Sequence, residues 1–215
     1  MKNLLRPFIP PFIWNLIARI ARLHHNRSDY LFDSSSATFK SRVQSSRGYL
    51  EYGIGKSTFW AFKNSSAKIY GVESDPGWIQ SVKEQCGHDQ RLQLKLIDLG
   101  PLGAWGYPLT FKNRHHFKDY ASSYWNEIDP NSIDLVLIDG RFRISCFYMT
   151  LAHARPGCTI IFDDYLPRPM YSVVEEDLQP IKIEGRQAIF SVPLFSEVQR
   201  ADFLKKAQEY QLVLD

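Results

Sequence analysis

A glycine turn runs through Tyr49-Leu50-Glu51-Tyr52-Gly53-Ile54-Gly55-Lys56-Ser57-Thr58, between an apolar run typical of a buried strand and the start of a helical pattern. Lys68–Val72 has the composition of a second strand, and Glu73 stands at its end. Glycines allow a sharp turn and the close approach of a ligand, and a carboxylate at the next strand tip can accept hydrogen bonds from both hydroxyls of a ribose. These features predict a strand-helix-strand unit that binds a nucleoside-containing cofactor.

Two other nucleotide motifs fit this turn poorly. Gly55-Lys56-Ser57-Thr58 matches the end of a phosphate-binding P-loop, but that motif needs a glycine five residues before Gly55, where Leu50 stands. The dinucleotide fingerprint fails as well, because Thr58 stands three residues after Gly55, where the fingerprint has Gly or Ala. These departures disfavour a nucleoside triphosphatase and a dinucleotide-binding enzyme.

Length and composition indicate one substantial core. The chain has 215 residues, of which 44% are hydrophobic, too few for two ordinary Rossmann-sized domains. The 26 basic and 23 acidic residues give a net charge of +3 with no long basic run, so we expect no nucleic-acid partner. Three cysteines without CxxC spacing suggest neither a disulfide framework nor a zinc site, and we expect a cytoplasmic protein.

The N-terminal segment is predicted as a helical extension, residues 1–47, before a main domain of residues 48–215. Apolar residues from Ile13 to Leu23 follow a helical spacing, while three prolines and two arginines exclude a membrane-spanning helix. One interpretation is a helix that packs on the domain or on a second subunit, which would make the protein a homodimer. The other is peripheral membrane contact through residues 1–25, at the inner face of the membrane.

Short apolar runs then alternate with longer helical patterns, which predicts a parallel sheet with helices between its strands. The expected strands are Gly48–Glu51, Lys68–Val72, Leu92–Ile97, Ile133–Ile138 and Thr159–Phe162. Helices are expected after Gly55, Pro76, His115 and Phe142 and near Tyr171. The pattern changes at Pro180–Glu184 and Gln187–Val192, which flank Gly185-Arg186 as in a hairpin, and a last helix is expected from Phe195.

Five parallel strands followed by an antiparallel pair resemble the doubly wound, seven-stranded, Rossmann-like α/β sheet of class I S-adenosylmethionine-dependent methyltransferases, over residues 45–193. The Glu51–Gly55 segment resembles that family's first motif, whose glycine turn lies under the methionine part of the cofactor. Glu73 matches the ribose-binding acid, and Asp98 matches the acid that reads the adenine amino group. The alternative role for each acid is that of a turn residue or a helix cap. Asp75 could bind the ribose in place of Glu73, but it precedes Pro76 and is better placed to cap the following helix. The resemblance implies S-adenosylmethionine as cofactor, bound by Glu51, Gly53, Gly55, Ser57, Glu73 and Asp98.

Three more carboxylates follow two later strands. Asp139 comes after the fourth strand, and Asp163 and Asp164 come after the fifth. Because ligands bind beyond the carboxyl ends of the strands in open α/β sheets, we expect these acids to converge beside the cofactor. The pattern resembles metal-dependent O-methyltransferases of the catechol and macrolide-sugar types. The resemblance implies that Asp139, Asp163 and Asp164 hold Mg²⁺, which would orient a hydroxyl for attack on the sulfonium methyl.

The chain departs from that pattern at Arg141-Phe142-Arg143, which follows the fourth-strand acid. The arginines could bind an anionic substrate, such as a phosphorylated or carboxylated sugar, or neutralise the acids without any metal. The candidate catalytic residues are Asp139, Arg143 and His115. Either His115 or the adjacent His116 could be the general base that removes the proton of the acceptor hydroxyl.

The sequence therefore predicts an O-methyltransferase that uses S-adenosylmethionine and a small hydroxylated acceptor. A sugar or surface-polysaccharide precursor is favoured, because Leu4–Pro11 resembles the start of bacterial surface-polysaccharide methyltransferases. The alternatives are a metal-independent methyltransferase with another acceptor, a non-catalytic binding or scaffold protein on the same fold, and an adaptor at a membrane surface.

Overall fold

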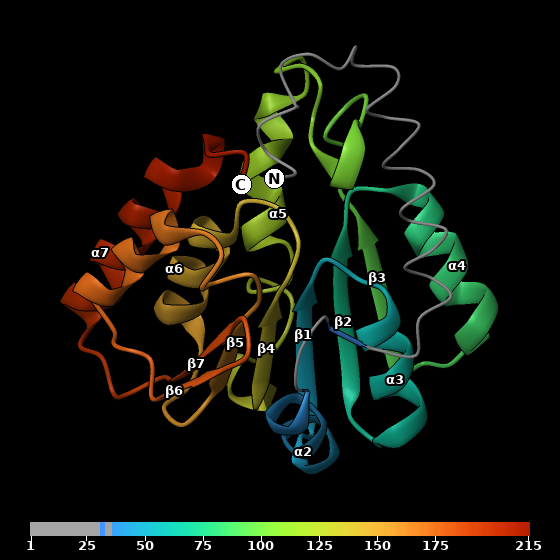
Figure 1. Ribbon diagram of the computed structural model, residues 1–215, viewed down its shortest axis with the longest axis horizontal. Helices are drawn as coiled ribbons and strands as arrows, with labels where there is room; N and C mark the ends of the chain where they lie inside the picture. The colour runs from blue at the N-terminus through green and yellow to red at the C-terminus, as the bar shows by residue number, and fades with distance from the viewer. Residues whose placement is uncertain (1–30, 33–35) are drawn as a thin grey trace.

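The computed structural model describes residues 31–32 and 36–215 (Figure 1). Its seven strands form one sheet in the order β3-β2-β1-β4-β5-β7-β6. The strands are β1 (Gly48–Tyr52), β2 (Lys68–Glu73), β3 (Leu92–Leu96), β4 (Leu135–Ile138), β5 (Thr159–Phe162), β6 (Lys182–Glu184) and β7 (Gln187–Ser191). Strands β1 to β5 are parallel, and β7 is antiparallel to both β5 and β6. The predicted sheet and its C-terminal hairpin are confirmed, and strand ends differ from the predicted ones by two residues at most.

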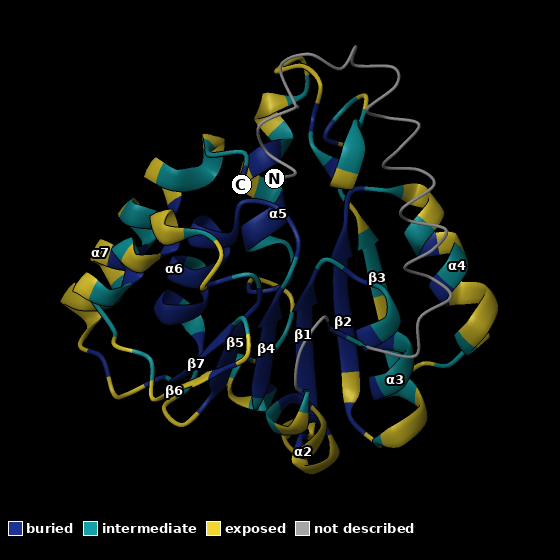
Figure 2. Cartoon of the chain, viewed as in Figure 1, coloured by how far each residue is buried: buried dark blue, intermediate teal, exposed yellow. Residues whose placement is uncertain are grey.

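Helices cover both faces of the sheet (Figure 1). They are α2 (Ala37–Ser45), α3 (Lys56–Asn64), α4 (Pro76–Cys86), α5 (Phe117–Ser122), α6 (Arg143–His153) and α7 (Glu197–Glu209), with a 3₁₀ helix at Pro169–Glu176. Side chains alternate between the faces along each strand, as the pleat requires. In β1, Leu50 and Tyr52 pack with α5, α6 and α7, whereas Tyr49 packs with α2 and α3. The strands are almost wholly buried at the centre of the sheet, and exposed residues lie on the outer surfaces of α4 and α7 (Figure 2).

Two of the helices, α4 and α7, begin with a side-chain cap. Asp75 caps α4 by accepting a hydrogen bond from the Gly77 amide at 2.8 Å, and Pro76 occupies the first turn. This confirms Asp75 as a helix cap. Ser196 caps α7, and Gln199 Oε1 accepts a hydrogen bond from the Ser196 amide at 3.0 Å.

The segment before β1 packs against the sheet. Phe32, Phe39 and Val43 are buried and belong to the same apolar cluster as Tyr49. The Thr38 amide also donates to Glu184 at 3.1 Å, which ties α2 to β6. The helix predicted within residues 13–23 and the membrane or dimer contacts of residues 1–25 lie outside the described residues, and the division at residue 47 stays a prediction.

Within residues 31–32 and 36–215, no helix is both long enough and apolar enough to cross a bilayer.

Candidate active site

A cavity of about 350 Å³ lies where the carboxyl ends of β1, β2, β4 and β5 meet. This is the edge at which open α/β sheets bind ligands, and the volume lies within the usual range for ligand pockets. The cavity brings together seven residues that the sequence proposes for the site: Gly53, Gly55, Ser57, Glu73, Asp139, Arg143 and Asp164.

The turn after β1 is shaped by close packing of two glycines. Gly53 has a left-handed backbone, with φ of 89°, which favours glycine. A Cβ atom on Gly53 would lie 2.5 Å from the Cα atom of Gly140, so no larger residue fits between the two loops. This packing places the β1 turn directly against the loop that follows β4.

Glu51 lies behind the turn and does not line the cavity. Its buried carboxylate accepts hydrogen bonds from the hydroxyls of Ser57 and Thr58, the latter at 2.7 Å. The Thr58 hydroxyl in turn accepts from the Gly55 amide at 2.9 Å. Burial raises the pKa of Glu51 to about 7, although the two hydroxyls oppose the shift. Glu51 therefore orders the glycine turn from behind, and its direct contact with a cofactor stays a prediction.

Glu73, at the end of β2, presents one carboxylate oxygen to the protein. Its Oε1 accepts hydrogen bonds from the amides of Ser74 and Asp75 at 2.6 and 2.8 Å. Burial raises the pKa of Glu73, and these amides oppose the shift. No group in the described part of the chain donates a hydrogen bond to Oε2. The cavity-lining Glu73 is therefore oriented by the backbone, with one oxygen left for a ligand.

Two residues predicted for the site lie outside the cavity. Asp98 is exposed and accepts a hydrogen bond from the Gly100 amide at 2.9 Å, as a turn residue does. His115 is exposed in a 3₁₀ turn, Arg114–His116, with its ring 4.0 Å from that of His116. The structure thus does not bring the predicted adenine reader or the predicted histidine base to the cavity.

Two tryptophans line the cavity that were not among the predicted site residues, Trp78 on α4 and Trp105 in the loop after β3. Trp78 is partly buried, with its ring 3.8 Å from the position of a Cβ atom on Gly55. Trp105 is 53% exposed and has a left-handed backbone, with φ of 60°, which is uncommon for a bulky side chain. Residue type alone could not separate these rings from ordinary packing anchors.

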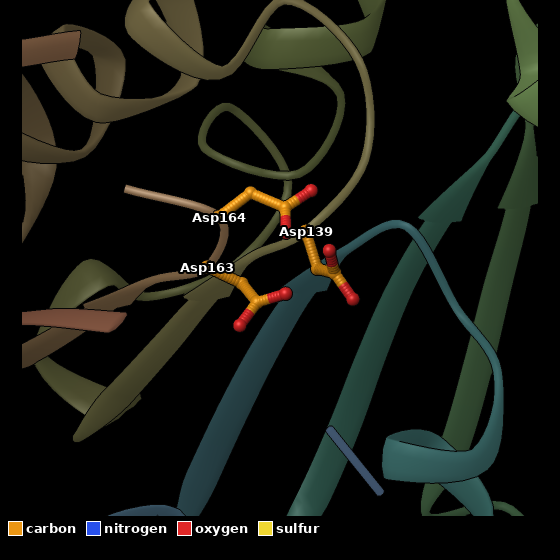
Figure 3. Close-up of side chains that lie close together, drawn as sticks. All are labelled: Asp139, Asp163 and Asp164. Carbon is orange, nitrogen blue, oxygen red and sulfur yellow. The ribbon is translucent and has the colours of Figure 1, made fainter. Parts of the chain in front are cut away.

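The three aspartates that follow β4 and β5 converge, as predicted (Figure 3). Asp139, Asp163 and Asp164 each offer an oxygen, and these oxygens lie within 4.8 Å of one another. Asp139 and Asp164 line the cavity, whereas Asp163 is fully buried beneath it. Burial and the nearby carboxylate of Asp163 raise the pKa of Asp139, although Arg143 opposes the shift.

Arginines surround this acid cluster. Arg186, in the β6–β7 turn, pairs with both oxygens of Asp163 and approaches Asp164 Oδ1 at 3.2 Å. Gln187 adds a hydrogen bond to Asp163 at 2.8 Å. Arg168 pairs with Asp164 Oδ2 at 3.1 Å.

Arg143 is 3% exposed and joins the loops that carry the acids. Its guanidinium donates to the backbone oxygens of Gly140, Asp163 and Asp139 at 3.0, 2.7 and 3.0 Å. The same group lies 3.2 Å from Asp139 Oδ1 and 3.5 Å from Asp164 Oδ2. Because its donors are already committed to the protein, Arg143 holds the shape of the site.

The side chains present do not fit the predicted Mg²⁺ site. Carboxylate oxygens suit Mg²⁺ as donors, but all three carboxylates here pair with guanidinium groups. Three arginine charges offset three carboxylate charges, so a dication would face Arg143, Arg168 and Arg186 at close range. The geometry matches the alternative in which arginines neutralise the acids without a metal.

Arg168 and Arg186 were not among the predicted site residues. The hairpin did hold a signal for Arg186, because a β7 strand antiparallel to β5 places the β6–β7 turn beside the end of β5, with Ala188 opposite Phe162. No comparable pattern marked Arg168.

No family model and no curated protein matches the chain. Among solved structures, a methyltransferase-like protein from Silicibacter pomeroyi is 28% identical, with a TM-score of 0.70, and the match covers 85% of this chain and 98% of that one. A methyltransferase from Geobacter sulfurreducens is 13% identical, with a TM-score of 0.51, and covers 90% and 96% of the two chains. The chain has the class I S-adenosylmethionine-dependent methyltransferase fold, as the sequence predicted.

Proposed function

We propose that the protein transfers the methyl group of S-adenosylmethionine to a hydroxyl group of a small acceptor, without a metal ion. The observation that carries this proposal is that Gly53, Glu73 and Asp139 line the same cavity. A glycine turn and a strand-end carboxylate suit a nucleoside cofactor, and a carboxylate with a raised pKa suits proton removal. A sugar or surface-polysaccharide precursor remains the acceptor class that the sequence favours.

On the cofactor side, the backbone of the glycine turn allows a ligand to approach closely, because Gly53 and Gly55 carry no side chain. Glu73 Oε2 would accept a hydrogen bond from a ribose hydroxyl, since Oε1 already accepts hydrogen bonds from backbone amides. When bound, S-adenosylmethionine supplies an electrophilic methyl group on a sulfonium. Orientation of the two reactants then provides much of the rate enhancement, because methyl transfer needs little covalent help from a protein.

On the acceptor side, Asp139 would act as the general base. Its carboxylate would accept the proton of the acceptor hydroxyl as that oxygen takes the methyl group, so that S-adenosylhomocysteine would be left as the second product. Arg143 lies 3.2 Å from this carboxylate and keeps it in place. Ionised Asp139 is the active form, and its raised pKa makes it a stronger base than an ordinary aspartate.

A methyl-transfer assay tests this proposal. The purified protein is mixed with methyl-labelled S-adenosylmethionine and pools of hydroxylated small molecules, with EDTA present, and product is measured in wild type, Asp139→Asn and Asp119→Asn. Asp119 lies on α5 beside His116 and outside the cavity, so its substitution is the matched control. We expect label to reach an acceptor hydroxyl in wild type and control, and Asp139→Asn to lose about a hundredfold or more of the rate. Equal rates in Asp139→Asn and wild type would contradict the proposed base.

A further inference from the structure

Arg141 differs from the other arginines of the cavity in its partners. Arg143, Arg168 and Arg186 all pair with aspartates. Arg141 lines the same cavity and is only 5% exposed, yet its buried Nη1 has no hydrogen-bond partner in the part of the chain that the structure describes. A buried charged donor without an acceptor is costly, and such groups are usually matched by a partner.

The position of Arg141 is fixed without an acidic partner. Its guanidinium carbon lies 4.4 Å from the centre of the Tyr107 ring, which orients the plane of the group. Its backbone amide donates to the Tyr120 hydroxyl at 3.4 Å, and its carbonyl accepts from Cys146 Sγ at 3.5 Å. Contacts on the main chain and on the ring face thus hold the guanidinium while Nη1 stays free to donate.

Asp215 is the carboxylate that partly balances the positive charge of Arg141. Burial raises the pKa of Asp215, and the positive charges of Arg143 and Arg141 oppose the shift. The bonded oxygen of Asp215, however, accepts from the Arg143 amide at 2.8 Å, and its other oxygen has no partner among the described residues either. Asp215 therefore balances part of the charge through space and leaves the donor of Arg141 unused.

We propose that Arg141 binds an oxyanion of the acceptor, a carboxylate or a phosphate group, and so makes the enzyme specific for anionic hydroxylated acceptors. This inference rests on the proposed function. A guanidinium pairs well with either group, and the stacked plane on Tyr107 favours two parallel hydrogen bonds to it. Arg141 stands two residues after Asp139, so an anion held there belongs with the molecule whose hydroxyl faces the proposed base.

The carboxylate of the cofactor's methionine part has the same chemistry, so the experiment must separate the two sources. Calorimetric titrations would use inorganic phosphate, glucose 6-phosphate and glucose at constant ionic strength, with the protein alone and loaded with S-adenosylhomocysteine. The proteins are wild type, Arg141→Gln and the control Arg47→Gln. Arg47 is an exposed arginine that pairs with Asp134 and does not line this cavity.

We expect wild type and Arg47→Gln to bind glucose 6-phosphate about tenfold or more tightly than glucose. Arg141→Gln should lose this preference, while its affinity for S-adenosylhomocysteine stays within about twofold of wild type. Its melting temperature should equal or exceed that of wild type, because the variant no longer buries an unpaired charge.

Three results would overturn the inference: no preference for the charged sugar in wild type, a preference that survives in Arg141→Gln, or loss of S-adenosylhomocysteine affinity in that variant, which would assign Arg141 to the cofactor. A wild type that binds phosphate through Arg141 but binds neither S-adenosylmethionine nor S-adenosylhomocysteine would remove the methyltransferase proposal and leave the anion site standing.

Discussion

Gly53 and Gly140 pack so closely that a Cβ atom on Gly53 would lie 2.5 Å from the Cα atom of Gly140. This contact joins the turn after β1 to the loop after β4, which carries Asp139 and Arg141. The turn after β1 and the loop after β4 therefore fix each other's position, and a change at either glycine affects both.

Gly53→Ala should lower both stability and cofactor affinity. The new methyl group meets backbone atoms that cannot move aside, and an L-residue is strained at a φ of 89°. We expect a loss of about 2 kcal/mol or more in unfolding free energy, measured by urea denaturation. Gly87→Ala is the matched control, because Gly87 has a φ of 71° with no atom within 4 Å of an added Cβ atom. Equal losses in the two variants would show that the packing of Gly53 on Gly140 contributes nothing.

Glu51 should make stability depend on pH. The pKa of Glu51 is about 7 in the fold, against 4.5 for the unperturbed group, so the folded state holds this proton more tightly than the unfolded state. Its contribution to stability is fully present below about pH 4.5 and declines as the pH rises through about 7, by roughly 3 kcal/mol at most.

Glu51→Gln should remove that dependence, because the amide oxygen still accepts from Ser57 or Thr58 and carries no charge. Urea denaturation between pH 4.5 and 8 measures the effect, with Glu84→Gln on the exposed face of α4 as control. A variant that follows the wild-type pH profile would assign the dependence to other groups.

The activity of the enzyme should rise with pH through the raised pKa of Asp139. Below that pKa the carboxyl is protonated and cannot accept the acceptor's proton, so the rate falls on the acid side. The acid limb of kcat/KM should be absent from the residual activity of Asp139→Asn. His115→Ala should keep the wild-type profile, because His115 lies outside the cavity. If the acid limb is lost in His115→Ala and kept in Asp139→Asn, His115 and not Asp139 is the general base.

Mg²⁺ should have no effect on cofactor binding or rate, and EDTA should not inhibit, because arginines already pair with the three aspartates. Asp163→Asn should instead destabilise the protein without any metal, by about 3 kcal/mol, since it breaks a buried pair with Arg186. Thermal unfolding of both proteins with Mg²⁺ and with EDTA measures this. Two results together would point to a metal site: Mg²⁺ raises the melting temperature of wild type, and Asp163→Asn melts below wild type only when Mg²⁺ is present.

The sequence predicted the sheet well because its signals are local. Apolar runs, helical spacing and the Gly185-Arg186 turn each depend on neighbouring residues, and the strand-end acids Glu73 and Asp139 follow from the position of each strand. The partners of those acids depend on contacts between distant segments. Arg186 reaches Asp163 across 23 positions of the chain, and the two side chains meet only because β7 pairs with β5.

The same limit explains the residues that the structure places outside the cavity. Asp98 follows the edge strand β3 and accepts a hydrogen bond from the Gly100 amide in its own loop. Glu51 accepts a hydrogen bond from the Thr58 hydroxyl behind the glycine turn. Their residue types and spacing match the family motif, but the direction of each side chain is set by its tertiary neighbours.

In the proposed function, the cavity binds S-adenosylmethionine through Glu73 and the glycine turn. The most direct test is calorimetric titration of wild type, Glu73→Ala and the control Glu84→Ala with S-adenosylmethionine. We predict that wild type and control bind alike, and that Glu73→Ala loses about tenfold to a hundredfold in affinity, as expected for hydrogen bonds to a charged group. Folded wild-type protein that does not bind S-adenosylmethionine, or a Glu73→Ala variant that binds it as wild type does, would contradict the claim.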